Sequence, residues 1–423
     1  MNKQDNRQKY WFYLDSYVYA AWKKDSALLY NPLTGHIQEY PNEPGIVKFL
    51  KRLHHPRNLL VIPVKQRDLK DPALARLVRD ARQHFMGDLV EQSHSKGKPV
   101  QMRSIVKIHR DVDRMKQEAS RSVGEDMMKY INELNLYLHN QCRQTCSVCG
   151  GAYRQFLHCT KDSGPNQQLA PEQIVYLMDH LDRGSLDTVN ILGGDPFAYE
   201  HWDELLKLLH PRDIKKVLVC HYKHLIGREK EVRTLKEKSW HMKIMVDFPL
   251  DQPSLEQAIQ ITSGLSSSRT IHFIVKSEEE FQQADALITG MGLETTQFHA
   301  YYDGTNENFF RAGVFIDRQT IAGSRPQTRD IHARQMINPL NFGNLTVLAN
   351  GNVHANVNKK HLGTLGKNSL YDMVFKEMKD GNSWRRTRNK VKPCADCLYC
   401  FICPPLSNYE YALGRNNLCD IGE

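Results

Sequence analysis

Residues 134–149 read LNLYLHNQCRQTCSVC, an apolar run of strand length that leads directly into three closely spaced cysteines. The cysteines are Cys142, Cys146 and Cys149, so their spacing is C-x3-C-x2-C. Thiolates two or three residues apart converge easily on one metal centre. The stretch therefore predicts a β-strand whose carboxyl end carries a metal-binding loop.

After this strand, short apolar segments alternate with segments of helical length. The further predicted strands span residues 188–192, 216–220, 243–247, 271–275 and 296–301, and the predicted helices span residues 171–181, 202–209, 228–238, 255–261 and 278–288. This alternation indicates parallel strands with right-handed crossovers, and six units predict an α/β fold with a partial (β/α)6 barrel. An open doubly wound sheet would give the same pattern. In a barrel, the cysteine loop would lie at the catalytic, carboxyl-terminal end of the strands.

The rest of the chain divides into three regions. Residues 1–95 predict an α+β unit, with a β-meander over residues 10–40, helices over 45–53 and 73–90, and a strand over 58–64. Residues 96–132 predict a linker and a polar helix over 110–131, residues 133–310 the barrel, and residues 311–423 a cysteine-rich domain. In this last region, Asn350-Gly351-Asn352 predicts a hairpin with a type I′ turn, followed by a helix over 369–378.

Composition restricts the class of protein. The 423 residues are 40% hydrophobic and 25% charged, and no apolar run approaches the ~18 residues of a membrane helix, so no membrane partner is predicted. The segment Met1–Gln8 is polar, which predicts a cytoplasmic location. The net charge of +9 is spread without a long basic block, so no nucleic-acid partner is predicted. The ten cysteines fall into two groups, which in a reducing compartment favours metal binding over disulfides.

The cysteine loop and the turn after the second strand carry the predicted chemistry. Three thiolates on one loop can hold three irons of a [4Fe–4S] cluster and leave one iron open. A zinc site completed by His139 or His158, or thiols that only pack, are the alternatives. The second turn reads NILGGDPF over residues 190–197, and its two glycines allow a ligand to approach the backbone closely.

Together these two turns resemble the radical S-adenosylmethionine (SAM) enzymes over residues 134–301. The resemblance implies that Cys142, Cys146 and Cys149 bind a [4Fe–4S] cluster whose open iron chelates SAM. In that family an electron from the cluster cleaves SAM to methionine and a 5′-deoxyadenosyl radical, which removes a substrate hydrogen. By the same resemblance, the cofactor-binding positions are Gly193, Gly194, Asp195, Pro196, Val148, Asp247 and Lys276. Val148 stands where the family usually has an aromatic residue, and Asp195 where it more often has glutamate.

The C-terminal cysteines resemble the SPASM/twitch type of iron–sulfur domain. Cys394-x2-Cys397-x5-Cys403 followed by Cys419 implies one auxiliary [4Fe–4S] cluster. A second auxiliary cluster is not expected, because Ser407, His354, Ala355 and Asn356 occupy the positions of its cysteines. Cys400 also fits a ferredoxin-like run, so either Cys400 or Cys403 could be the third ligand, and a four-cysteine zinc knuckle is the alternative. Cys159 and Cys220 are predicted to be structural thiols, although Cys159 could also contact substrate.

The N-terminal unit resembles the winged-helix precursor-recognition element of ribosomal-peptide maturases, which binds a leader peptide as an added strand. A structural cap on the barrel is the alternative. The three parts in this order resemble radical SAM/SPASM peptide maturases, and residues 403–410 resemble a Gly-Gly-leader branch that includes pseudo-radical SAM proteins. We therefore expect modification of a ribosomally made precursor peptide, by a thioether or carbon–carbon crosslink, with flavodoxin or ferredoxin as electron donor. The alternatives are a non-catalytic partner that presents the peptide and a maturase that acts on a folded protein.

Overall fold

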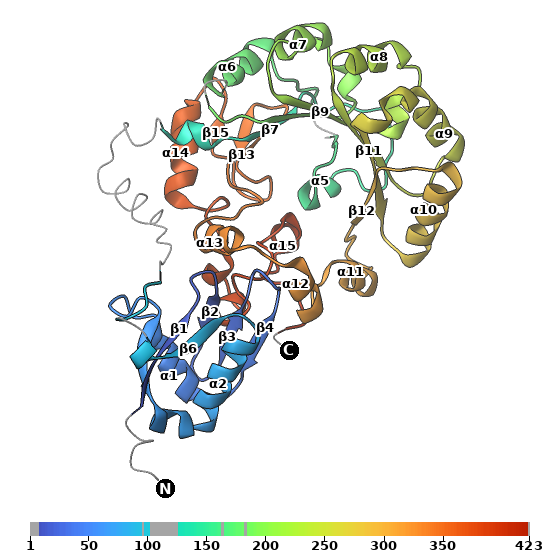
Figure 1. Cartoon of the computed structure of the whole chain (residues 1–423). Coiled ribbons are helices and arrows are strands. Elements are labelled where there is room, and N and C mark those ends of the chain that lie inside the picture. Colours follow the sequence, from blue (N-terminus) through green and yellow to red (C-terminus); the bar gives the residue numbers. More distant parts are fainter. Residues whose placement is uncertain (1–7, 95–96, 102–125, 162–164, 182–183, 422–423) are drawn as a thin grey trace.

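Three β-sheets organise the part of the chain that the computed structural model describes, which is residues 8–94, 97–101, 126–161, 165–181 and 184–421 (Figure 1). One sheet has nine strands and the other two have three each. Most of the predicted polar helix over residues 110–131 lies outside the described residues, and its end forms the 3-10 turn η3 (Asp126–Tyr130). No helix within the described ranges has both the length and the apolar character needed to cross a bilayer.

The nine-stranded sheet contains the predicted parallel series. Its six consecutive parallel strands are β7 (Glu133–Tyr137), β8 (Thr188–Leu192), β9 (Lys215–His221), β10 (His241–Val246), β11 (Arg269–Val275) and β12 (Thr296–Ala300). The connecting helices are α6 (Pro171–Leu181), α7 (Trp202–Leu209), α8 (Glu229–Glu237), α9 (Gln252–Ile261) and α10 (Glu278–Met291). All five helices line the outer, convex side of the curved sheet (Figure 1). A doubly wound sheet would carry helices on both faces, so the partial barrel is the correct alternative.

Alternate residues of these strands serve two different cores. Ile191, Leu218 and Ile244 belong to the large cluster that the outer helices cover. Leu192, Val219 and Met245 belong to a second cluster inside the barrel, together with Ala152 of the short helix α5 (Ala152–Gln155). Both faces of a parallel sheet are buried, and the residue period of two fixes which side chains face the lumen. His221, Asp247 and Lys276 lie two residues after a lumen residue of β9, β10 and β11, respectively. Their side chains therefore point into the mouth of the barrel.

Beyond the barrel, the sheet continues through β13 (Asn344–Val347), which pairs in parallel with β7. It then adds the antiparallel strands β14 (Asn352–His354) and β15 (Gly363–Thr364). The predicted hairpin is confirmed, but its type I′ turn is wrong. Gly351 has a φ of 78° and its N–H donates to the Leu348 carbonyl, whereas a type I′ turn needs positive φ at two successive residues. The predicted helix is α14 (Leu370–Asp380), which Ser369 caps. The remaining helices are α11 (Glu307–Val314), α12 (Arg318–Ser324), α13 (Thr328–Met336) and α15 (Asn408–Leu413).

The N-terminal unit contains two antiparallel sheets and the helices α1 (Pro44–Leu53) and α2 (Pro72–Gln83). The meander is β2 (Tyr19–Trp22), β3 (Ala27–Tyr30) and β4 (Ile37–Tyr40), whereas β1 (Lys9–Leu14) pairs with β5 (Val61–Lys65) and β6 (Gly87–Glu91) instead. The predicted helix over residues 73–90 therefore ends too late. Gly87 lets β6 lie directly against β1, since a Cβ there would come 2.1 Å from the Tyr13 carbonyl oxygen. The winged-helix likeness stays a prediction.

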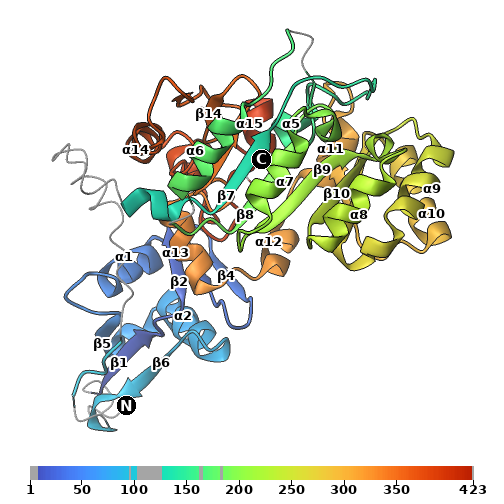
Figure 2. The same ribbon diagram turned by 90° about the horizontal axis from the view of Figure 1, so that it is seen from above.

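The meander of the N-terminal unit packs on the C-terminal cysteine region (Figures 1 and 2). Leu28 and Tyr30 share one buried cluster with Tyr399, Ile402 and Cys403. The ammonium group of Lys23 donates to the Ala395 carbonyl at 2.6 Å, and the Tyr399 hydroxyl donates to Glu39. The two regions therefore form one core, although they lie at opposite ends of the sequence described.

Removing the hydroxyl of Tyr30 should measure the strength of this contact. Tyr30 is fully buried, and its hydroxyl donates to the Pro326 carbonyl at 3.0 Å. We expect Tyr30→Phe to lower the free energy of unfolding by about 1 kcal/mol, because a buried carbonyl loses its partner. Tyr130→Phe, at a residue that is 52% exposed, is the matched control and should change it by less than about 0.5 kcal/mol. Equal shifts in the urea midpoint of the two variants would show that the hydrogen bond from Tyr30 to Pro326 does not stabilise the protein.

Candidate metal centres

The first candidate centre is the cysteine loop between β7 and α5, at the carboxyl end of the first barrel strand. Cys142, Cys146 and Cys149 are free thiols, and each is half-buried. The backbone N–H of Gln144 donates to the Cys142 sulfur at 3.3 Å, and that of Lys161 donates to the Cys149 sulfur at 3.4 Å. Hydrogen bonds of this kind stabilise thiolates as metal ligands. The loop follows the first barrel strand, as the sequence predicts, and its role as a metal ligand stays a prediction.

The Gly193-Gly194 turn at the end of β8 lies directly against the backbone that leads into this loop. The Gly194 N–H donates to the His139 carbonyl at 2.8 Å, and the Asp195 N–H donates to the Gln141 carbonyl at 2.9 Å. A Cβ at Gly194 would come 1.9 Å from the Gln141 oxygen, so only glycine fits there. The structure thus brings the two predicted turns together, with the Asp195 carboxylate capping η4 (Pro196–Ala198) through the Phe197 N–H.

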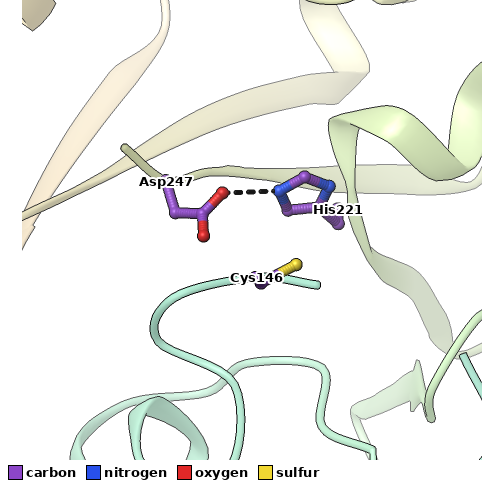
Figure 3. A group of neighbouring side chains, drawn as sticks. All are labelled: Cys146, His221 and Asp247. Atoms are coloured by element: carbon purple, nitrogen blue, oxygen red, sulfur yellow. Dashed lines mark hydrogen bonds and ion pairs between the residues drawn. The ribbon is translucent and has the colours of Figure 1, made fainter. Parts of the chain in front are cut away.

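Polar side chains at the carboxyl ends of β9 and β10 complete the mouth of the barrel (Figure 3). The imidazole Nε2 of His221 lies 2.8 Å from Asp247 Oδ1, and both residues are buried. The Cys146 thiol completes a group of three donor atoms that all lie within 4.8 Å of one another. Burial alone would raise the pKa of the Asp247 carboxyl, but the hydrogen bond and charge of His221 hold that pKa below its usual value.

Asp247 and Lys276 both reach the cysteine loop through Ser147. The Ser147 N–H donates to Asp247 Oδ2 at 3.1 Å, and the Lys276 ammonium donates to the Ser147 hydroxyl at 3.3 Å. Both predicted strand-end residues therefore meet the loop that carries the cysteines. Val148, in contrast, is fully buried in the lumen cluster.

Burial of the loop affects the protonation of its thiols. Burial raises the pKa of the Cys142 thiol, and burial together with the nearby Asp247 carboxylate raises the pKa of Cys146 to about 12. Thiols with raised pKa values stay protonated until a cation replaces the protons. A metal bound by these residues would therefore displace protons from the thiols.

The zinc alternative requires donors closer together than these cysteines. Thiolates on one tetrahedral zinc ion lie about 3.8 Å apart, given a Zn–S distance of about 2.3 Å. Among the described residues, the group of three donors within 4.8 Å is Cys146, His221 and Asp247, and it contains one cysteine. The ring nitrogens of His139 face the Gln141 N–H and the Asp195 carbonyl, so His139 is not available as the fourth ligand. The three loop cysteines do not form such a group among the described residues, which fits separate irons of one cluster better than a single zinc ion.

The second candidate centre is a cavity of about 460 Å³ in the C-terminal region. All five C-terminal cysteines line it, namely Cys394, Cys397, Cys400, Cys403 and Cys419, and all are free thiols. Burial raises the pKa of Cys403 to about 12; the Arg388 guanidinium opposes this shift, and the neighbouring Cys394, Cys419 and Cys397 act in the same direction as burial. Burial likewise raises the pKa of Cys400 to about 12, with a further contribution from Cys394 and Cys397. The cavity fits a cluster held by four of the five thiols.

No family model and no curated protein matches this chain. Several solved structures resemble it. The crystal structure of Streptococcus suis SuiB matches 97% of this chain and 100% of its own, at 11% identity and a TM-score of 0.45. SuiB bound to its precursor peptide SuiA matches 93% of this chain and 94% of its own, at 12% identity and a TM-score of 0.42. Native anSMEcpe with bound AdoMet and a Cp18Cys peptide matches 67% of this chain and 95% of its own, at 11% identity and a TM-score of 0.45.

Several residues of the two centres are not predicted from the sequence. His221 could have been found, because it continues the lumen parity of Val217 and Val219 at the end of a predicted strand. His224 lies 3.2 Å from the Cys142 sulfur through its Nε2, but it follows the strand in a turn that no pattern marks. Arg388, which lies 3.5 Å from the Cys394 sulfur, carries no sequence signal either. Cys220 is buried in the core outside the lumen, as expected of a structural thiol.

Proposed function

We propose that this chain is a radical SAM enzyme that modifies a ribosomally made precursor peptide, most simply by a thioether or carbon–carbon crosslink. The observation that carries the proposal is that three free thiols on one strand-end loop lie next to a turn in which Gly194 leaves no room for a side chain. A [4Fe–4S] cluster at Cys142, Cys146 and Cys149 would supply the electron for SAM cleavage and an open iron that chelates SAM.

The residues around the loop would bind and orient SAM. Backbone groups of the turn from Gly193 to Pro196 would hold its amino group, Lys276 would contact its carboxylate, and Asp247 would accept hydrogen bonds from its ribose hydroxyls. Asp247 is held ionised by His221 at 2.8 Å, so it offers a fixed negative charge in a largely buried site. The apolar lumen below, with Met245 and Ile274, would exclude water from the reacting carbon.

The C-terminal cavity would hold one auxiliary [4Fe–4S] cluster on Cys394, Cys397, Cys403 and Cys419. Cys403 is the third ligand in the C-x2-C-x5-C spacing, and Cys400, which lines the same cavity, is the alternative. Four cysteine ligands leave no open iron, which favours electron relay over binding of the peptide. An external flavodoxin or ferredoxin would supply the electrons.

The N-terminal unit would bind the leader of the precursor peptide. Within residues 10–30, β1 and β3 are central strands and β2 is an edge strand, so β2 is the edge that could accept an added strand. A leader that pairs there would lie beside the C-terminal cysteine region.

Iron content, colour and SAM cleavage test the proposal together. Anaerobically reconstituted protein should be brown, contain about eight irons per chain and release 5′-deoxyadenosine when supplied with SAM and dithionite. Intact iron without 5′-deoxyadenosine would favour the non-catalytic partner that presents a peptide. Product formed on a folded protein but not on a short peptide would favour the maturase of folded proteins.

A single divalent ion is the second candidate, and the Cys146, His221 and Asp247 group favours it. Three protein ligands with an open position are typical of a catalytic zinc site. This alternative predicts a colourless protein with one tightly bound metal and no SAM cleavage, so the same measurements separate the two.

A further inference from the structure

A buried guanidinium group lies beside the C-terminal cysteine cavity. Arg388 is on the 3-10 turn η7 (Arg388–Lys390), its side chain is 6% exposed, and its Nη1 lies 3.5 Å from the Cys394 sulfur. A buried cation is costly unless charges and hydrogen-bond acceptors compensate it. The position of Arg388 therefore calls for a reason beyond packing.

Part of the compensation comes from α15 and the chain just before it. Arg388 Nη2 lies 2.7 Å from Glu410 Oε1 and 3.3 Å from the Pro405 carbonyl, while Nε donates to the Pro404 carbonyl. Glu410 in turn accepts the Ser407 N–H at 2.8 Å. These bonds fix the plane of the guanidinium and leave Nη1 aimed at the sulfur.

Other cations around the cavity are arranged differently. Arg318 lines the cavity, but its side chain is 63% exposed and lies 3.7 Å from Glu39. Lys23 donates to the Ala395 carbonyl rather than to a sulfur. Solvent screens an exposed charge such as that of Arg318, whereas it screens a buried charge little. Arg388 is therefore placed to act on the electrostatics of whatever the cysteines bind.

We infer that Arg388 is a positioning residue that raises the reduction potential of the cluster held by Cys394 and its neighbours. This inference rests on the proposed function, since it requires an iron–sulfur cluster in the cavity. Gaining an electron makes a cluster more negative, so a fixed positive charge and an N–H donor at a ligating sulfur stabilise the reduced form. The reduction potential of the cluster would therefore be set by residues of this chain and not by the electron donor.

The test isolates the C-terminal cluster in a Cys142→Ala, Cys146→Ala, Cys149→Ala parent of the full chain. EPR-monitored titration with dithionite measures the potential in Glu410→Gln and in the Arg388→Gln, Glu410→Gln double variant, which avoids stranding a buried carboxylate. We expect Glu410→Gln to raise the potential, because a nearby negative charge is lost. The double variant should lower the reduction potential by about 59 mV relative to the parent. At a fixed solution potential, this raises the ratio of oxidised to reduced cluster about tenfold for one electron.

Matched variants separate tuning from structure. Lys390→Gln removes the same charge on the same turn, but this exposed side chain binds the Arg385 carbonyl, so the potential should change less than twofold in the ratio. Arg388→Lys keeps the charge and should restore part of the shift. The inference would be overturned if the double variant had the same potential as the parent. It would also be overturned if Glu410→Gln and the double variant shifted the potential in the same direction. Absence of a cluster from the parent itself would instead overturn the proposed auxiliary site.

Discussion

Replacing Cys146 with alanine is expected to abolish 5′-deoxyadenosine formation and to remove about four of the eight irons, while the other four remain. Cys146 is the central cysteine of the loop, and its thiol lies within 4.8 Å of the His221 and Asp247 donors at the barrel mouth. The C-terminal cavity draws its ligands from a different part of the chain. Its cluster should therefore keep its absorbance and EPR signal. Iron analysis, the visible spectrum and product chromatography check the three parts of this result.

Cys220→Ala is the matched control, because it removes a thiol one residue before His221 without touching the loop. Cys220 is fully buried in the core between the barrel and its outer helices. It should keep all the iron and SAM cleavage, with a modest loss of stability. Loss of both clusters in Cys146→Ala would show that the two centres are not separate, and unchanged SAM cleavage would rule out the loop as the radical centre.

Gly194→Ala is expected to eliminate SAM binding and most of the iron at the first centre. The new Cβ would come 1.9 Å from the Gln141 oxygen and 2.4 Å from the Gln141 carbonyl carbon. Both are backbone atoms next to Cys142, so the overlap cannot be relieved by turning a side chain. The loop must shift, at a cost on the order of 3 kcal/mol, and Cys142 moves with it. Equilibrium binding of SAM and iron analysis measure the loss.

Gly290→Ala provides the control for this substitution. Gly290 is an exposed residue of α10, and a Cβ there meets no atom within 4 Å. This change should leave SAM binding and iron intact and raise the free energy of unfolding by about 0.5–1 kcal/mol, because alanine favours the helix. If Gly194→Ala behaved in the same way, the turn would have no part in the site.

The barrel could be predicted from the sequence because its strands and helices are set by local patterns. Apolar runs such as Thr188–Leu192 and the helix Pro171–Leu181 match the structure at both ends. The cysteine loop and the Gly193-Gly194 turn could be placed together because parallel strands bring their carboxyl ends to one edge. Parity along those strands then fixes Asp247 and Lys276 in the lumen.

The pairing of distant segments could not be predicted in the same way. Residues 87–90 continue the predicted helical pattern, yet they belong to β6 because β1 offers an unpaired edge 70 or more residues earlier. The neighbours of the C-terminal cysteines are also set by tertiary contacts, as Arg388 with Glu410 and Lys23 with Ala395 show. Neither pair has a spacing that a local pattern could reveal.

The shared core of the meander and the cysteine region has a consequence for how the protein is made. Glu39 and Tyr399 are 360 residues apart, so ribosomes working at 5–20 residues per second need about 20–70 s to produce the second partner after the first. During that interval Leu28 and Tyr30 lack the C-terminal residues Tyr399, Ile402 and Cys403 that bury them in the folded protein. Nascent chains are therefore expected to engage chaperones at this face, and iron delivery to the late cysteines would coincide with its closure.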